Sequence, residues 1–306
     1  MTADLVRSTL AERRYRRMKI VIIGSGGRLG AALMRAYHAR FEVIGFNHAQ
    51  LDLTDQKQIR EAVGRVDFNL LINAAAFTSV DRCETEADQA FAINAEAPRI
   101  LAEICANKNA KLIHFSTDYV FDGEKRSPYV EDDAARPISA YGESKRVGEK
   151  FVLQASDRHS VVRVSWVFGP DRPSFIDAMI KRGREEEDVE AIADKWSTPT
   201  CTTDIAEMLP RLFVVDAGLV HLANSGKCTW QEYAQHALDC CRKAGVPLKA
   251  KTVGALKLAD MANWVARRPV YSVLSSAKYQ ALTGIAPRSW RDAVADYIER
   301  SYSSKK

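Results

Sequence analysis

Glycines that directly follow a short apolar segment are the feature that most constrains the fold of this chain. The segment Lys19–Ile23 is β-branched, which predicts a strand buried on both faces. Glycines follow at 24, 27 and 30, and residues 31–40 then have helical spacing of apolar residues. A strand, a Gly-rich turn and a helix in this order predict a dinucleotide-binding unit, because Gly24, Gly27 and Gly30 let the backbone approach a pyrophosphate and the helix N-terminus attracts its charge. A plain Gly-rich turn is the alternative.

The next segment bears on the choice of nicotinamide cofactor. Residues 41–46 are predicted to form a second strand, which ends in Asn47 and His48 without an acidic residue. A carboxylate at that point would bind the ribose 2′-hydroxyl of NAD and repel a 2′-phosphate. Its absence, with Arg28 and His48 nearby, favours NADPH. Use of NADH remains an alternative, because the Arg28 and His48 side chains could be exposed to solvent without contacting the cofactor.

Two later segments are placed to line the same cofactor site. Asp52, followed by Leu53, could contact the adenine end of the cofactor or cap the helix that comes next. The strand predicted over 67–73 ends in Ala74, Ala75 and Ala76. Three small side chains at a strand end leave room for a flat ligand, although tight packing would also explain them.

A phenol, an amine and a hydroxyl are predicted to meet beside this site. Residues 111–115 form an apolar run that predicts a buried strand, and Thr117 follows it. Tyr141 and Lys145 open a predicted helix and are four residues apart, so they share one helix face. These groups suit proton transfer to a carbonyl oxygen. Thr117 could instead only cap the end of its strand, and the Tyr-x-x-x-Lys pair by itself is a weak signal.

The order of elements predicts an α/β fold with a doubly wound parallel sheet, Rossmann-like, and a smaller C-terminal substrate-binding region. Further strands are expected at 161–169 and 219–223, a long helix at 84–107, and a polar loop over the site at 123–137. We expect residues 1–17 to be a basic N-terminal extension and 18–170 to be the NAD(P)-binding domain, to which 199–223 return. Residues 171–198 and 224–306 are expected to form the substrate-binding region.

Composition excludes several classes of protein. The chain has 306 residues, 46% of them hydrophobic, and a net charge of +5 that is concentrated in residues 13–19, so nucleic-acid binding is not indicated. No apolar run approaches the length of a membrane span. The six cysteines form no Cys-x-x-Cys pair and have no neighbouring His cluster, which favours free thiols in a cytoplasmic protein without a metal site. The sequence does not specify an oligomeric state, and a homodimer is among those it permits.

Taken together, these residues resemble the extended short-chain dehydrogenase/reductases, and within them the dTDP-4-dehydrorhamnose reductase family. The resemblance spans residues 18 to about 300. The motifs that carry it, in chain order, are Gly24 to Gly30, Asn73-Ala74-Ala75-Ala76 with Val80-Asp81, Ser116 to Phe121, Tyr141 to Lys145 with Gly148-Glu149, Arg163 to Val167, Pro199-Thr200, and Arg267-Arg268-Pro269 with Ser272 and Leu274.

The resemblance implies reduction of the C4 keto group of a nucleotide-linked 6-deoxy-sugar, dTDP-4-dehydro-L-rhamnose above all, by NADPH. It implies that Tyr141 is the general acid, that Lys145 assists it and holds the nicotinamide ribose, and that Thr117 orients the carbonyl. The cofactor-binding residues would be Gly24, Gly27, Arg28, Leu29, Gly30, Asp52, Leu53, Ala74, Ala75, Ala76, Asn94, Tyr141 and Lys145. The substrate would be bound by Thr117, Asp118, Trp166, Arg267 and Arg268.

Alternatives remain for several of these residues and for the function. Trp166 could be a core residue, and Arg267 and Arg268 could pair with surface acids instead of a diphosphate. His114 and His221 are expected to be structural. The family's Asp-Gln-x-Gly turn is replaced here by Asp194-Lys195-Trp196-Ser197, which puts the identity of the sugar in question. Other functions compatible with the motifs are a different nucleotide-sugar epimerase or reductase, or a non-catalytic NADP-binding subunit resembling the methionine adenosyltransferase beta subunit.

Overall fold

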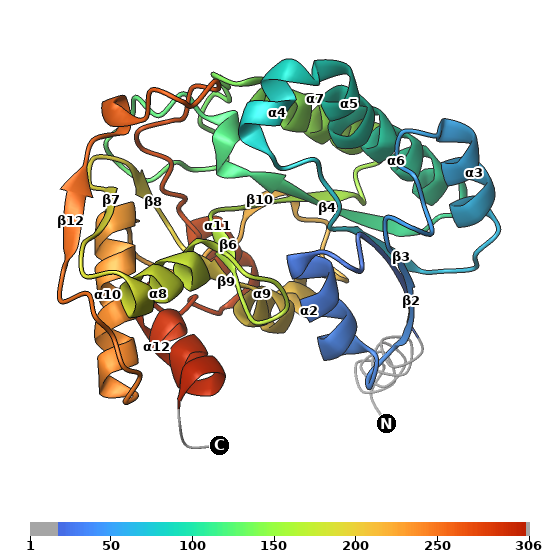
Figure 1. Cartoon of the computed structure of the whole chain (residues 1–306). Coiled ribbons are helices and arrows are strands. Elements are labelled where there is room, and N and C mark those ends of the chain that lie inside the picture. Colours follow the sequence, from blue (N-terminus) through green and yellow to red (C-terminus); the bar gives the residue numbers. More distant parts are fainter. Residues whose placement is uncertain (1–17, 304–306) are drawn as a thin grey trace.

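The computed structural model describes residues 18–303 and shows a parallel sheet with helices on both faces (Figure 1). The expected basic extension, residues 1–17, lies outside the described residues. The sheet consists of β1 (Lys19–Ile23), β2 (Glu42–Phe46), β3 (Leu70–Asn73), β4 (Lys111–Thr117), β5 (Ser160–Val164) and β10 (Gly218–His221). Its strands lie in the order β10-β5-β4-β3-β1-β2 and all run parallel. The direction of winding reverses between β1 and β3, which is where ligands bind in such sheets. The predicted doubly wound fold is confirmed.

The helices lie on either face of the sheet and beyond its β10 edge (Figure 1). They are α2 (Arg28–Tyr37), α3 (Gln56–Gly64), α4 (Val80–Thr85), α5 (Ala87–Phe91), α6 (Ala97–Asn107), α7 (Ala140–Ala155), α8 (Phe175–Glu185), α9 (Thr202–Met208), α10 (Trp230–Lys243), α11 (Ala277–Thr283) and α12 (Trp290–Tyr302). Short strands pair outside the main sheet: β6 (Val167–Phe168) with β9 (Thr200–Cys201), β7 (Val189–Ile192) with β12 (Val253–Leu256), and β8 (Trp196–Ser197) with β11 (Cys228–Thr229).

The core follows from the alternation of side chains along each strand. In β1, Ile20 and Ile22 pack towards α2 and α9, whereas Val21 and Ile23 pack towards α3 and α6. Both faces of this strand are apolar because both are covered, as expected for a parallel sheet. The carboxyl ends of the parallel strands lie on the same side of the sheet, and the polar residues of the site follow them.

The long helix expected over 84–107 is interrupted. It ends at Thr85, restarts as α5, and then contains a π-helical turn, Ala92–Glu96, before α6. The turn directs the Asn94 side chain inward, where its amide oxygen accepts from Phe77 N at 2.8 Å and its amide nitrogen donates to Phe77 O and Ser144 Oγ. A π turn in a helix often marks a functional site, and this one fixes the loop that follows β3.

The strand expected over 161–169 is also interrupted. β5 ends at Val164, and β6 begins only at Val167. Trp166, between them, has φ of +45°, a left-handed backbone conformation that is uncommon for a residue other than glycine. The break directs the chain away from the main sheet and turns the Trp166 indole onto Trp230, with ring centroids 5.0 Å apart.

A second core lies between α8, α10 and α12, which stand together beside the sheet (Figure 1). Tyr233, Phe168 and Trp290 are buried there with the described cysteines 201, 228, 240 and 241. All six cysteines are buried free thiols. Within residues 18–303, no helix has both the length and the apolar composition needed to cross a membrane.

Candidate active site

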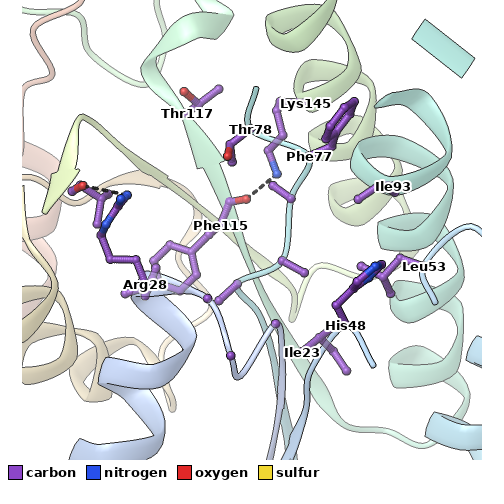
Figure 2. Close-up of a pocket in the computed structure, with 18 of the residues that line it drawn as sticks. Ile23, Arg28, His48, Leu53, Phe77, Thr78, Ile93, Phe115, Thr117 and Lys145 are labelled. Atoms are coloured by element: carbon purple, nitrogen blue, oxygen red, sulfur yellow. Dashed lines mark hydrogen bonds between the residues drawn. The ribbon is translucent and has the colours of Figure 1, made fainter. Parts of the chain in front are cut away.

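A cavity of about 1370 Å³ opens at the carboxyl ends of β1, β3, β4 and β5. Figure 2 shows Lys145 and Thr117 at one end of it and His48 and Leu53 at the other. The residues predicted from the sequence that line the cavity are Gly24, Gly27, Arg28, Leu29, Asp52, Leu53, Ala74, Ala75, Ala76, Thr117, Asp118, Tyr141, Lys145 and Trp166. The predicted residues Gly30, Asn94, Arg267 and Arg268 are not among its lining residues.

The Gly-rich turn leaves backbone instead of side chains facing the cavity. Gly24 has φ of +80°, and a Cβ on it would lie 2.8 Å from Ala75 N. A Cβ on Gly30 would lie 2.0 Å from Gly24 O, so Gly30 is needed for packing of α2 against the turn and not as a lining residue. Gly27 is the N-cap of α2 and offers no side-chain cap to its N–H groups. An anionic phosphate therefore fits at this helix N-terminus.

Asp52 lies on the cavity wall and does not cap the next helix. Its Oδ1 accepts hydrogen bonds from Thr54 N and Thr54 Oγ1, both at 2.8 Å, and these bonds hold the pKa of the Asp52 carboxyl below its ordinary value. The cap of α3 is Asp55, whose Oδ1 accepts from Gln58 N at 3.0 Å. Of the two alternatives drawn from the sequence, the helix cap is therefore wrong for Asp52.

Thr117, Tyr141 and Lys145 are brought together by one close helix contact. Thr117 ends β4, and its Oγ1 accepts from Tyr119 N at 3.2 Å. A Cβ at position 142 would lie 2.2 Å from Tyr119 O, so Gly142 allows the first turn of α7 to reach the end of β4. Tyr141 then lies beside the Thr117 hydroxyl, which lowers the pKa of the Tyr141 phenol against the effect of burial. Lys145 lies one turn later on the same helix, as its spacing predicts.

Lys145 contacts the backbone of β4 and the buried imidazole of His114. Its Nζ donates to Phe115 O at 2.7 Å and lies 3.2 Å from His114 Nε2 (Figure 2 shows the first contact). His114 Nδ1 lies 3.0 Å from Asn73 Nδ2, and Asn73 Oδ1 accepts from Ala75 N. Asn73 therefore links the Ala75 backbone to the imidazole that lies beside Lys145. His114, expected to be structural, thus contacts a predicted catalytic residue.

Burial sets the protonation states of these groups. It raises the pKa of the Tyr141 phenol above its ordinary value, against a lowering effect of the Thr117 hydroxyl, so the phenol keeps its proton at neutral pH. Burial also lowers the pKa of Lys145 to about 8, despite the opposing charge of Glu149. His114 is neutral, because burial and the Lys145 charge both lower its pKa. The arrangement is a protonated acid beside an amine that titrates near neutrality, which suits general acid catalysis.

A carboxylate, Asp118, and an indole, Trp166, also line the cavity. Asp118 Oδ2 accepts from Ser165 Oγ at 2.9 Å, and its Oδ1 accepts from Thr117 Oγ1 at 3.2 Å. Trp166 lines the cavity and also packs against Trp230, so it belongs to the wall and to the neighbouring core. The two sequence-based alternatives for Trp166 therefore do not exclude each other.

Two arginines join the Gly-rich turn to the segment after β6. The Arg28 guanidinium donates to Val167 O, Arg172 O and Pro173 O, with Nη2 to Pro173 O at 2.6 Å. Arg172, which lines the cavity, donates from Nε to Gly26 O at 2.6 Å. Arg172 was not indicated by the sequence, because it lies outside the motifs and its contact with Gly26 joins segments far apart in the chain.

Arg268 is occupied by an ion pair with Asp81. Its Nη2 donates to Asp81 Oδ2 at 2.7 Å, and its guanidinium lies 3.7 Å from the Trp264 ring centroid. Asp81 also accepts from the backbone N–H groups of Val265 and Ala266. In the structure Arg268 thus pairs with an acid, the second of the two alternatives drawn from the sequence, and the pair acts as a clamp that holds loop 264–268 against the start of α4. Arg267 is exposed and outside the cavity lining.

Asn94 supports the site from behind. Its amide fixes the loop at Phe77, which itself lines the cavity. A Cβ on Gly148 would lie 2.2 Å from Asn94 O, so the π turn packs closely on α7. Asn94 was predicted to contact the cofactor, but its side chain does not line the cavity. The polar loop 123–137, expected over the site, also contributes no residue to the cavity lining.

A Gly-rich turn at the reversal point of a doubly wound sheet, with a Tyr and a Lys one helical turn apart beside a strand-end Thr, defines the class of extended short-chain dehydrogenase/reductases. A family model, the RmlD substrate binding domain, matches residues 18–303. The chain therefore belongs to the dTDP-4-dehydrorhamnose reductase family.

Individual relatives agree with this assignment. The chain is 31% identical to the dTDP-4-dehydrorhamnose reductase of Escherichia coli (strain K12), over 94% of this chain and 99% of the relative. It is 36% identical to a probable dTDP-4,6-dihydroxy-2-methyloxan-3-one 4-ketoreductase of Streptomyces antibioticus, over 91% and 94%. A crystal structure of the dTDP-4-dehydrorhamnose reductase of Bacillus anthracis in complex with NADP superposes with a TM-score of 0.87 at 30% identity, covering 93% of this chain and 99% of that one.

Proposed function

We propose that this protein reduces the C4 keto group of a nucleotide-linked 6-deoxy-sugar with NADPH, converting dTDP-4-dehydro-L-rhamnose to dTDP-L-rhamnose. The observation that carries the proposal is the convergence of Thr117, Tyr141 and Lys145 in the cavity of the Gly-rich turn. The family and the activities of its reductases supply the substrate class.

In this proposal each side chain acts on the carbonyl oxygen or on the acid that protonates it. Tyr141 donates its phenolic proton to the C4 oxygen as that oxygen gains negative charge. Thr117 orients the carbonyl towards Tyr141, and the positive charge of Lys145 favours the phenolate that remains. NADPH, when bound, supplies the hydride. The raised pKa of Tyr141 suits reduction of the keto group, because the phenol is already protonated when the sugar binds.

The cavity fits a dinucleotide along its glycine-lined wall. The uncapped N-terminus of α2 would bind the pyrophosphate, Ala74 to Ala76 would border the nicotinamide half, and Asp52 and Leu53 the adenine half. No acid follows β2, and the exposed His48 and the lining Arg172 are both near this end. A 2′-phosphate would meet no carboxylate at the end of β2, so we expect NADPH to bind more tightly than NADH.

The sugar would occupy the end bordered by Asp118 and Trp166. We assign residues 18–170 and 199–223 to cofactor binding, and 171–198 with 224–306 to substrate binding, since β10 pairs with β5 after the chain has left the sheet. The six free cysteines support a place in the reducing cytoplasm.

The test is consumption of NADPH absorbance with dTDP-4-dehydro-L-rhamnose generated in place, alongside NADH and the Tyr141→Phe variant. Turnover that requires both the sugar and Tyr141 supports the proposal. NADPH binding without turnover would overturn it and favour the regulatory alternative.

A second substrate deserves the same assay, because the Streptomyces antibioticus relative is named for a different dTDP-4-keto-sugar. The ratio of kcat/KM for the two sugars decides between them. Inversion of the sugar without net consumption of NADPH would instead identify an epimerase.

A further inference from the structure

Lys195 is a buried cation beside the sugar end of the cavity. It lies in the turn between β7 and β8, in the segment Asp194-Lys195-Trp196-Ser197, and only 1% of it is exposed. Among residues 18–303, its Nζ has one hydrogen bond, a long one of 3.4 Å to Ser197 Oγ. A buried ammonium with so few partners is unfavourable unless an opposite charge compensates it.

Lys195 lies against Tyr119, which lines the sugar end of the cavity, and against Trp230, which packs behind that wall. Its Nζ lies 5.2 Å from the Tyr119 ring centroid and 5.9 Å from the Trp230 ring centroid. The Tyr119 ring lies 5.8 Å from that of Tyr141, and the Trp230 ring packs on Trp166. Lys195 itself does not line the cavity. Any effect on the substrate must therefore pass through a neighbour.

That neighbour is Asp118, and hydroxyl groups of the Lys195 segment and of Ser165 lie between the two residues. Ser197 Oγ, the partner of Lys195, lies 3.1 Å from Ser272 Oγ, and Thr198 N of the same segment donates to Ser165 Oγ at 3.5 Å. Asp118 in turn accepts from Ser165 and Thr117. An ionised Asp118 can accept a hydrogen bond from each of these hydroxyl groups. A protonated Asp118 would itself be a donor, so one of the hydroxyl groups would have to become an acceptor.

The charges around Asp118 show why a cation is needed there. Burial raises the pKa of the Asp118 carboxyl, and the Lys195 charge is the largest influence that lowers it. Burial in turn lowers the pKa of Lys195 to about 8, against the effect of Asp118. The other titratable groups that face this pair are Tyr119, Tyr141, Arg268 and Asp81.

We propose that Lys195 is a positioning residue that keeps Asp118 ionised and so fixes the direction of the hydrogen bond that Thr117 donates to Asp118, beside Tyr141. Thr117 then donates to Asp118 and accepts from Tyr119 N, so the Tyr141 proton stays available for the carbonyl of the sugar. The carboxylate is left as an acceptor for a hydroxyl of the sugar. The inference deepens the proposed function, because it concerns which sugar groups the same site recognises.

The experiment compares Lys195→Met, which keeps the length of the side chain and removes its charge, with Lys195→Arg, which keeps a charge. Lys227→Met is the matched control, because Lys227 is an exposed lysine over Trp196 in the same region. Wild-type turnover is measured first. Its absence would count against the proposed function and not against the role of Lys195, which the spectroscopic measurement below tests independently.

In an active enzyme we expect Lys195→Met to raise KM for the sugar nucleotide about tenfold, the difference between a hydrogen bond to a charged and to a neutral acceptor. The Kd for NADPH should not change.

The acid limb of the kcat/KM profile of Lys195→Met should move to higher pH by about one unit or more, because loss of a nearby cation makes Asp118 bind a proton more readily. Lys195→Arg should restore the profile, and Lys227→Met should match wild type. An unchanged acid limb in Lys195→Met would overturn the proposal.

The second measurement does not depend on turnover. The carboxyl carbon of Asp118 is observed by NMR in protein labelled with ¹³C at aspartate side chains, and its signal is assigned by its loss in Asp118→Asn. We expect the titration midpoint of Asp118 to rise in Lys195→Met and to stay in Lys227→Met. Equal midpoints in wild type and Lys195→Met, with both proteins folded by thermal melting, would exclude the role of Lys195.

Discussion

The two ends of the cavity are built in different ways. The cofactor end consists of backbone and small side chains that come from consecutive βα units, such as Gly24 and Ala75. The sugar end consists of large and charged side chains from segments far apart in the chain, such as Asp118, Trp166 and, behind the wall, Lys195. The comparison shows that local sequence patterns can specify a cofactor site, whereas a substrate site of this kind depends on how distant segments meet.

The largest expected effect is at the point where the two ends join. Tyr141→Phe removes the proton donor and leaves the ring, and we expect kcat to fall about 10²–10⁴-fold, the range of general acid catalysis. NADPH affinity should stay at the wild-type value, as measured by fluorescence titration. Full turnover of the Tyr141→Phe variant would show that Tyr141 is not the proton donor.

The cofactor end should be intolerant of single added methyl groups. In Gly30→Ala the new Cβ would lie 2.0 Å from Gly24 O, a backbone atom that cannot move easily. We expect a loss of about 1–3 kcal/mol of stability or more, with weaker NADPH binding. Gly64→Ala is the matched control, because nothing lies within 4 Å of a Cβ there, and helix propensity favours alanine by about 0.5–1 kcal/mol. Thermal melts and NADPH titration of both variants decide the matter, and equal melting temperatures would contradict the prediction.

The sugar end should depend on the clamp between Asp81 and loop 264–268. Asp81→Asn weakens two hydrogen bonds from Arg268, and we expect a loss of about 1–3 kcal/mol of stability. KM for the sugar nucleotide should rise while the Kd for NADPH is unchanged. Asp67→Asn, which removes an exposed pair with Lys19, is the control and should have no measurable effect.

The Asp81 clamp also predicts a pH dependence. The Arg268 hydrogen bond holds the pKa of Asp81 below its ordinary value, so the folded state binds this proton less readily than the unfolded state. Its stabilisation is therefore complete above the unfolded pKa of about 3.9 and is lost as pH falls through the folded pKa. Denaturant unfolding of wild type and Asp81→Asn should converge at acidic pH. A difference that stays constant with pH would show that the charge of Asp81 is not what stabilises the loop.

The smallest effect is expected at Arg267. Its side chain is exposed and lies outside the cavity lining, in contrast to that of Arg268. Arg267→Ala should change KM for the sugar nucleotide by less than about twofold, since an exposed charge contributes little. A rise as large as that in Arg268→Ala would restore the diphosphate role that the sequence suggested for both residues.

The sequence predicted the doubly wound sheet and the grouping of Gly24, Thr117, Tyr141 and Lys145 because these depend on periodicity and spacing along one or two elements. It did not indicate the clamp of Arg268, because the partner Asp81 is distant in sequence and either surface pairing or phosphate binding fits an Arg-Arg-Pro segment. The break at Trp166 was also missed, since the Trp166 indole packs on Trp230 of α10, a contact between segments far apart in the chain. The contact of His114 with Lys145 requires the register of β4 against α7, which no local pattern contains.

The late arrival of β10 has a consequence for synthesis on the ribosome. The strands from β1 to β5 and the Gly-rich turn emerge in one stretch, so a cradle for NADPH can assemble while the rest of the chain is still being made. The free edge of β5, however, stays open until residues 218–221 emerge and pair with it. During this interval the nascent chain presents an unpaired parallel edge, a template for wrong pairing with other chains.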